Sequence, residues 1–306
     1  MAPTSETRQP KQPQQPQQVE PASGLGVLLK AALPSVPVVN QLPGVRKTAP
    51  TDFTGLSLTR PPVTVERSAV DAYARVCGFP TKDVAPLTYP HMLVFGLQMA
   101  MMSDPAFPAP AIGTVHLENS ITQHRPVAIG ETLSVTAGVG PKVAHPKGTI
   151  YEFTTSIADE SGDVVWEETS AYLRRGRGEE GASYGMTFPE APAKGLTWKL
   201  PDDLGRRYAA VSGDHNPIHL YPLTAKALGF KRQIAHGMWT KARCVAALEN
   251  RLPDAVRVDV AFKKPVFLPG TVAFGSAALA DGWAFSLSNP KSGAPHLAGR
   301  TTTLGA

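Results

Sequence analysis

The chain repeats one pattern of residues in its two halves, and this repeat limits the possible folds more than any other feature. Residues 63–78 align without a gap on residues 198–213, so that a tyrosine, an alanine, a valine and a glycine recur at matching places. Each segment is followed by a histidine, His91 or His236, and by an apolar stretch of helical length. A basic residue, a proline and a strand come next in both halves. An ordered series of matches over this length predicts an internal duplication.

Each half is predicted to contain a short helix, a longer apolar helix and then several strands. The strands show alternating apolar residues and β-branched side chains, as in residues 149–157 and 257–266. The stretch from residue 236 to 250 is apolar on most of its faces, so we expect it to be buried against a sheet. Runs of consecutive strands after a helix indicate antiparallel sheets and the α+β class.

Composition divides the chain where the repeat begins and ends. Residues 1–23 are rich in proline and glutamine and lack the apolar content that would offset the entropy of ordering, so a disordered tail is expected. Residues 176–195 combine glycine, proline and charge without periodicity, which is typical of an interdomain linker. The predicted order is a tail, a connecting segment, an N-terminal unit, a linker and a C-terminal unit, over residues 1–23, 24–59, 60–175, 176–195 and 196–306.

Charge, apolar content and cysteines narrow the class of protein. The 306 residues carry a formal net charge of +5, but no basic run with interleaved aromatic residues, so nucleic acid is not an expected partner. The longest apolar stretch, residues 91–102, is too short to span a bilayer, and the first residues lack the apolar core of a signal peptide. Cys77 and Cys244 do not define a disulfide framework. We therefore expect a cytoplasmic protein with no membrane span.

The loop after the second short helix concentrates the residues that can carry chemistry. Asp214 and His219 lie five residues apart in it, among two turn-forming pairs, Ser-Gly and Asn-Pro. A carboxylate and an imidazole held near one water molecule can deprotonate it and return a proton elsewhere. Asn216 can orient that water, or an acyl group, through its amide. Gly237 begins the long helix, and its N–H group can bind a developing enolate oxygen at close range.

This segment resembles the hydratase-2 motif of the MaoC-like family, which comprises (R)-specific enoyl-CoA hydratases and 3-hydroxyacyl-thioester dehydratases. The family's pattern is an aromatic residue, then Ser-Gly-Asp-x-Asn-Pro-hydrophobic-His, and further on Ala-His-Gly. The chain has Tyr208, residues 212–219 (SGDHNPIH) and residues 235–237 (AHG) in that order. The resemblance covers the C-terminal unit well and the N-terminal unit more weakly, as a degenerate copy.

The resemblance implies both a fold and a reaction. The fold is a double hotdog, in which antiparallel sheets each wrap around a long central helix. The reaction is the reversible hydration of trans-2-enoyl thioesters to (R)-3-hydroxyacyl thioesters in fatty acid metabolism, on acyl-CoA or on an acyl carrier protein. The assembly is expected to be a homodimer or a monomer with a pseudo-dimeric core. No metal and no organic cofactor is expected, because an acid–base pair and an oxyanion donor suffice for this chemistry.

The resemblance also implies roles for individual residues. Asp214 and His219 exchange the protons, Asn216 supports the site, and the Gly237 N–H polarises the thioester carbonyl. Further residues are expected to bind the substrate: Ser212, Gly213, Ile234, His236, Met238, Lys263 and Lys264. Lys241 belongs to a group of basic residues that fit the phosphates of an anionic carrier.

The N-terminal unit departs from the motif. Between Gly78 and His91 it has no Asp-x-Asn-Pro-x-His, and Asp83 is the only carboxylate there. This unit is therefore expected to be catalytically inactive. We interpret it as a means of widening the acyl tunnel for long or bulky chains.

Four other interpretations are kept at this point. A non-catalytic protein that binds acyl thioesters would keep the fold, and a dehydratase for a non-fatty acyl-CoA would keep the site. A thioesterase would share the hotdog fold, although the Asp-x-Asn-Pro-x-His loop is not expected of one. Asp214 and His236, with His215 and His219, would also suit zinc or iron, but Pro217 disfavours the helix that would align the two loop histidines.

Overall fold

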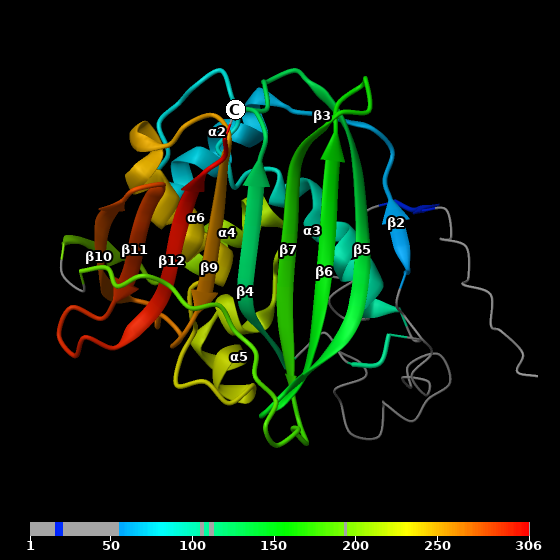
Figure 1. Ribbon diagram of the computed structural model, residues 1–306. Helices are drawn as coiled ribbons and strands as arrows, with labels where there is room; N and C mark the ends of the chain where they lie inside the picture. The colour runs from blue at the N-terminus through cyan, green and yellow to red at the C-terminus, as the bar shows by residue number, and fades with distance from the viewer. Residues whose placement is uncertain (1–15, 21–54, 105–106, 110–112, 193–194, 306) are drawn as a thin grey trace, which may run out of the picture.

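The computed structural model describes residues 16–20, 55–104, 107–109, 113–192 and 195–305 (Figure 1). The first half contains β1 (Gln17–Gln18), β2 (Ser57–Thr59), β3 (Val63–Thr64), α2 (Arg67–Cys77), α3 (His91–Ser103), β4 (Thr114–Gln123), β5 (Thr132–His145), β6 (Gly148–Ala158) and β7 (Val164–Arg175). The second half contains β8 (Leu196–Leu200), α4 (Leu204–Ser212), η3 (Pro217–His219), α5 (Pro222–Ala227), α6 (Gly237–Leu248), η4 (Glu249–Arg251), β9 (Val256–Phe262), β10 (Gly270–Leu279), β11 (Gly282–Ser288) and β12 (Pro295–Thr303).

The described strands form one twelve-stranded sheet. Its centre is the antiparallel pair of β4 and β9, in which Ser120 lies opposite Asp259. The prediction of two separate sheets was therefore wrong. The two units share one sheet because β4 and β9 satisfy each other's backbone groups, which would otherwise form an exposed edge at this point.

The order of elements repeats as an internal duplication predicts. Outward from the central pair, the strand order is β4-β7-β6-β5 on one side and β9-β12-β11-β10 on the other, and β3 and β8 complete the two series. In each half a short helix, α2 or α4, precedes a longer one, α3 or α6. The two short helices are in contact, and the matching side chains Tyr73 and Tyr208 have ring centroids 6.3 Å apart.

The helices lie on one face of the sheet (Figure 1). Helix α3 contacts β5, and α6 contacts β11 and α2. Most of α6 is buried, as its apolar sequence predicts, and the indole N–H of Trp239 donates to the carbonyl of Val76 at 3.0 Å. That bond ties the long helix of the second half to the short helix of the first. Among the described residues, no helix combines the length and apolar character needed to cross a membrane.

The segment between β7 and β8 crosses the opposite face of the sheet (Figure 1). It follows Arg175 and precedes Leu196, where a linker is predicted. The Tyr184 hydroxyl donates to Glu152 on β6 at 2.8 Å, so the segment is attached to the first half. The carbonyl of Pro192 accepts a hydrogen bond from Ser286 on β11, also at 2.8 Å, so it is attached to the second half as well.

The N-terminal tail differs in part from its prediction. Gln17 and Gln18 form β1, which pairs in parallel with Leu58 and Thr59 of β2. The prediction of disorder was wrong for these two residues, because the outer edge of β2 offers unpaired backbone groups to the chain. The rest of the predicted tail, residues 1–15 and 21–23, and residues 24–54 of the connecting segment lie outside the described residues.

Gly205 sets how closely α4 approaches the loop that carries His219. A Cβ atom at this position would overlap the carbonyl group of His219. We expect Gly205→Ala to lower the free energy of unfolding by about 1–3 kcal/mol, because the backbone must move to relieve the overlap. Denaturant unfolding measures the change. Gly176→Ala is the control, since a Cβ there meets no described atom within 4 Å. Equal losses in the two variants would contradict this account of the packing.

Candidate active site

Local hydrogen bonds shape the loop that carries the predicted pair. Helix α4 ends at Ser212, and Gly213 takes a left-handed conformation with φ +74°. The N–H of Asp214 then donates to the Ser212 hydroxyl at 3.1 Å, and the N–H of Asn216 donates to the Asp214 carboxylate at 3.1 Å. The Asn216 side chain in turn accepts from the N–H of Ile218, which caps the short helix η3. The loop is therefore held by its own polar residues, as such residues commonly do in turns.

The structure brings Asp214, His219 and His236 together. One side-chain nitrogen or oxygen of each lies within 4.8 Å of the others. The two imidazole rings stack, with centroids 3.7 Å apart, and the Asp214 carboxylate lies 3.7 Å from Nε2 of His236. His219 is 7% exposed and His236 2%, whereas the Asp214 side chain keeps 25% exposure. Asp214 is thus the member of the cluster that reaches the surface.

Hydrogen bonds to carbonyl groups define which imidazole nitrogens carry a proton. Nδ1 of His219 lies 2.8 Å from the carbonyl oxygen of Ile234, and Nε2 of His236 lies 2.9 Å from the carbonyl oxygen of Asp214. A carbonyl oxygen only accepts, so these two nitrogens donate. In the neutral rings, Nε2 of His219 and Nδ1 of His236 then keep free lone pairs. Nδ1 of His236 is buried and has no hydrogen-bond partner among the described residues.

Burial and mutual contact set the charges of the cluster. Burial lowers the pKa of His219, although the Asp214 carboxylate opposes this. Burial and the neighbouring His219 lower the pKa of His236 to about 3. Burial alone would raise the pKa of Asp214, but His236, His219 and the Asn216 N–H outweigh it and leave that pKa below its ordinary value. At neutral pH the cluster therefore consists of one carboxylate and two neutral imidazoles.

Gly237 is the first residue of α6 and lies next to His236, the helix N-cap. The first N–H groups of a helix have no carbonyl partner within the helix, and His236 makes no side-chain cap to them. A Cβ atom on Gly237 would lie 3.3 Å from the ring of Phe262 on β9, so glycine allows close packing here. A helix end of this kind can stabilise a negatively charged oxygen.

The predicted substrate-binding residues separate into two groups. Ser212, Gly213, Ile234, His236 and Met238 lie in the loop, in the short extended segment that contacts it, or in the first turn of α6.

The other group consists of two exposed lysines after β9. Burial raises the pKa of Glu118, and the charge of Lys263 acts against this rise. Glu118 lies on the face of the sheet that the linker crosses. The carbonyl of Lys264 accepts from the His296 ring at 2.9 Å. Neither lysine has a described contact with Asp214 or His219.

Lys241 is placed differently from its prediction. Its side chain is 0% exposed and donates to Asn119 and to the carbonyl of Val258. Lys241 is therefore not one of the basic residues that can meet the phosphates of a carrier, and the expectation that it lies at the surface was wrong. The reason is that this side of α6 is turned toward the sheet and not toward solvent.

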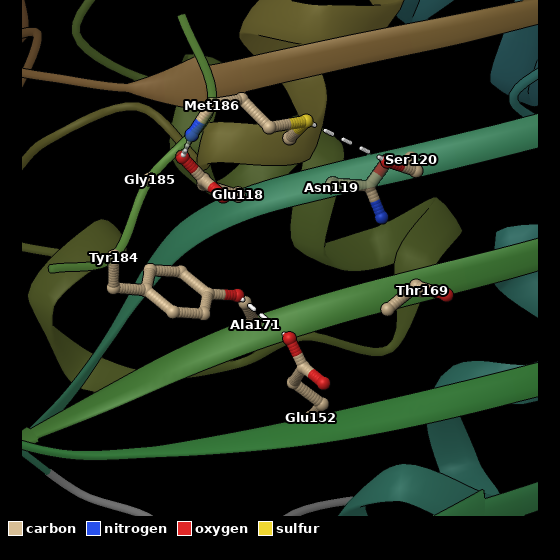
Figure 2. A pocket seen from close by; sticks show the side chains of 9 residues that line it. All are labelled: Glu118, Asn119, Ser120, Glu152, Thr169, Ala171, Tyr184, Gly185 and Met186. Atoms are coloured by element: carbon tan, nitrogen blue, oxygen red, sulfur yellow. Dashed lines mark hydrogen bonds between the residues drawn. The ribbon is translucent and has the colours of Figure 1, made fainter. Parts of the chain in front are cut away.

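A cavity of about 270 Å³ lies on the other face of the sheet, under the linker (Figure 2). The N–H of Met186 in the linker donates to Glu118 at 2.6 Å, so the linker satisfies one of the acidic groups that line the cavity. The sheet separates this cavity from Asp214 and His219. Its lining consists of Glu118, Asn119, Ser120, Glu152, Thr169, Ala171, Tyr184, Gly185 and Met186.

Sequence reasoning missed a buried polar group in the first half. Glu168 on β7 is buried, and its carboxylate forms a hydrogen bond with Nδ1 of His91 at 2.9 Å. One signal in the sequence of β7 could have revealed it. Residues 166, 168, 170 and 172 alternate onto one face of the strand, and two of them, Glu168 and Ser170, are polar. A carboxylate at an inward position of a buried strand needs a partner.

The cluster of Asp214, His219 and His236 also provides a set of possible metal ligands. Asp214, His219 and His236 offer one carboxylate and two imidazoles at suitable spacing for a divalent cation. His215, which the sequence placed in such a set, is not among them.

Comparisons with known proteins identify related sequences and related folds. The family model described as "MaoC like domain" matches residues 186–280. The 3-hydroxyacyl-thioester dehydratase X of Mycobacterium tuberculosis is 37% identical over 281 residues, which cover 90% of this chain and 96% of that protein. The crystal structure of HtdX from the same organism has 35% identity and a TM-score of 0.73, over 81% of this chain and 100% of that one. A double-hotdog protein of Mycobacterium tuberculosis has 13% identity and a TM-score of 0.52, over 82% of this chain and 96% of that one.

The shared sheet with helices on one face is thus a double hotdog of the α+β class, and the chain is an enzyme, a hydro-lyase. It belongs to the MaoC-like family.

The histidine cluster should make the protein sensitive to acid. Because the folded state lowers the pKa of His236 to about 3, the unfolded chain binds a proton below about pH 6.5 that the native protein does not. The native state therefore loses stability as the pH falls below about 6.5. We expect His236→Gln to show a smaller fall in Tm between pH 7 and pH 4.5 than the wild type. His124→Gln, which changes an exposed histidine outside the cluster, is the control. Identical slopes in all three proteins would refute this assignment.

Proposed function

We propose that the enzyme catalyses the reversible addition of water to trans-2-enoyl thioesters, which gives (R)-3-hydroxyacyl thioesters. The observation that carries this proposal is the neutral His219, which lies in one cluster with the Asp214 carboxylate and whose Nε2 keeps a free lone pair. The start of α6 lies beside this pair, since His236 at its N-cap is stacked on His219. Membership of the MaoC-like family supports the class of reaction.

In the hydration direction, Asp214 and His219 take a proton from water while the water oxygen bonds to C3 of the substrate. The electron pair of the C2–C3 double bond then forms an enolate with the thioester carbonyl. C2 finally takes a proton from Asp214 and His219, which restores both residues to their starting charges. Dehydration follows the same steps in reverse, so the reactants present decide the direction.

The remaining loop residues support this chemistry. The Gly237 N–H stabilises the enolate oxygen at the positive end of α6. Asn216 holds the Asp214 carboxylate through its N–H. No cofactor is part of the proposal, because the enolate needs only an oxyanion donor and an acid–base pair. Metal analysis of the purified protein tests the alternative in which Asp214, His219 and His236 bind a cation.

We further propose that the two units have different roles. Residues 196–306 carry the catalytic site, and residues 60–175 form an inactive copy that leaves more room for long or bulky acyl chains. The substrate is a fatty acyl thioester of coenzyme A or of an acyl carrier protein in the cytoplasm, and the enzyme acts as a monomer or homodimer. Ratios of kcat/KM for enoyl thioesters of four to sixteen carbons test the role of the first unit, and a maximum at four carbons would refute it.

Asp214→Asn and His219→Ala should each lower kcat by about 10²–10⁴-fold, because each removes one member of the proton-transferring pair. Loss of the enoyl thioester absorbance, measured with crotonyl-CoA and a long-chain enoyl-CoA, reports the rate, and chiral analysis identifies the (R)-3-hydroxy product. His215→Ala is the control, since His215 lies in the same loop but outside the cluster. Wild-type activity in either site variant would contradict the proposal. A wild-type protein that is inactive on acyl-CoA and on acyl-carrier thioesters would instead favour a non-catalytic acyl-binding protein.

A further inference from the structure

A chain of buried polar side chains connects α6 of the second half to α3 of the first. It runs from Lys241 through Asn119 and Glu168 to His91, and all four residues are buried. Three of them belong to the inactive half. Buried charged groups are costly unless they are paired and hydrogen bonded, so a connected set of this kind indicates a specific role.

Lys241 is fully satisfied inside this chain. Its ammonium group donates to the side-chain oxygen and to the backbone carbonyl of Asn119 on β4, the latter at 3.3 Å, and to the carbonyl of Val258 on β9 at 3.0 Å. Three acceptors match the three donors of an ammonium group. Lys241 therefore holds α6 to the central pair of strands, where the two halves meet.

Glu168 supplies the opposite charge through Asn119. The side-chain amide of Asn119 donates to the Glu168 carboxylate, and Ser170 and His91 complete the contacts of that carboxylate. Because Asn119 accepts from Lys241 with its oxygen and donates to Glu168 with its nitrogen, one amide joins the cation to the anion.

The charges of the pair depend on each other. Burial would raise the pKa of Glu168, but His91, Lys241 and Asn119 outweigh it and lower that pKa, so Glu168 is anionic. Burial lowers the pKa of Lys241 to about 7, and Glu168 is the principal group that opposes this shift. Asp259 also opposes it, and Arg257 adds to it. Without Glu168, the Lys241 ammonium group would lose its principal counter-charge.

We propose that Glu168 and Asn119 of the inactive half are positioning residues of the active site, because they hold Lys241 and with it the first turn of α6. Lys241 lies four residues after Gly237, so in a regular helix its N–H bonds the carbonyl of Gly237 and both residues lie on one face. That face rests on β9 through Phe262 next to Gly237 and through Val258 next to Lys241. The inactive half thus fixes the direction of the Gly237 N–H. This inference rests on the proposed function.

The test compares Glu168→Gln, Lys241→Met and the double variant in the full-length protein. Loss of the hydrogen-bonded charge should misplace an oxyanion donor that acts in the transition state, so kcat should fall about tenfold or more while KM stays within about twofold. The loss should be equal for four-carbon and long-chain enoyl-CoA, because the acyl tunnel is not affected. A loss confined to long chains would overturn the proposal.

The double variant separates positioning from mere stability. Each single variant removes one of the two opposite charges that Asn119 joins and should lower Tm, whereas the double variant removes both charges and should recover much of that Tm. We expect kcat to stay low in the double variant, because Lys241 no longer holds α6. Recovery of kcat together with Tm would show that the network only stabilises the fold, and would overturn the proposal.

Lys82→Met is the matched control. The ion pair of Lys82 with Glu249 also joins the two halves, at 2.9 Å, but at the opposite end of α6 from Gly237. This variant should keep the wild-type kcat, and a tenfold loss in it would overturn the assignment to Glu168 and Lys241. The wild-type assay keeps the two proposals apart, since an inactive wild type refutes the proposed function, whereas active single variants on an active background refute only this inference.

Discussion

The antiparallel pairing of β4 with β9 is the interaction on which the rest of the structure depends. It makes one sheet of two repeated units and places the long helices of both units on the same face. It also sets β7, β4 and β9 side by side, in the order in which Glu168, Asn119 and the acceptor carbonyl of Val258 follow one another. The helix that begins beside the candidate site of the second unit is therefore held against strands of the first.

Much of the fold could be predicted because the sequence repeats its own elements. The turn residues and the apolar stretch after His236 are local patterns, and the structure has a buried helix there. The shared sheet could not be predicted in this way. Which strand lies at the centre depends on contacts between residues 118–123 and 256–261, which are far apart in the chain, and no local pattern specifies that pairing. The short strand at Gln17 is missed for the same reason, since its partner lies in β2.

The residues of the candidate site also fall into two groups, those that a local pattern could predict and those that depend on contacts between distant residues. Asp214, Asn216 and His219 belong to one loop, whose own hydrogen bonds hold them, so the motif and its spacing could predict that they lie together. The proximity of His236 followed from the motif. Lys241 was misplaced because a lysine on a helix is expected to face solvent, and α6 turns this one toward the sheet. Glu168 comes from a strand whose inward polar residues have meaning only once Lys241 and His91 are seen beside them.

The network between the halves has a consequence for folding. Neither half contains both Lys241 and Glu168. The strand at the inner edge of each half of the sheet, β4 or β9, has its bonding partner in the other half. A half that folded alone would bury a charge without its counter-charge and expose the edge of a sheet. The repeated units are therefore not independent folding domains. The shared pair of strands and the buried network couple the folding of the two units, so that the stability of each depends on the presence of the other.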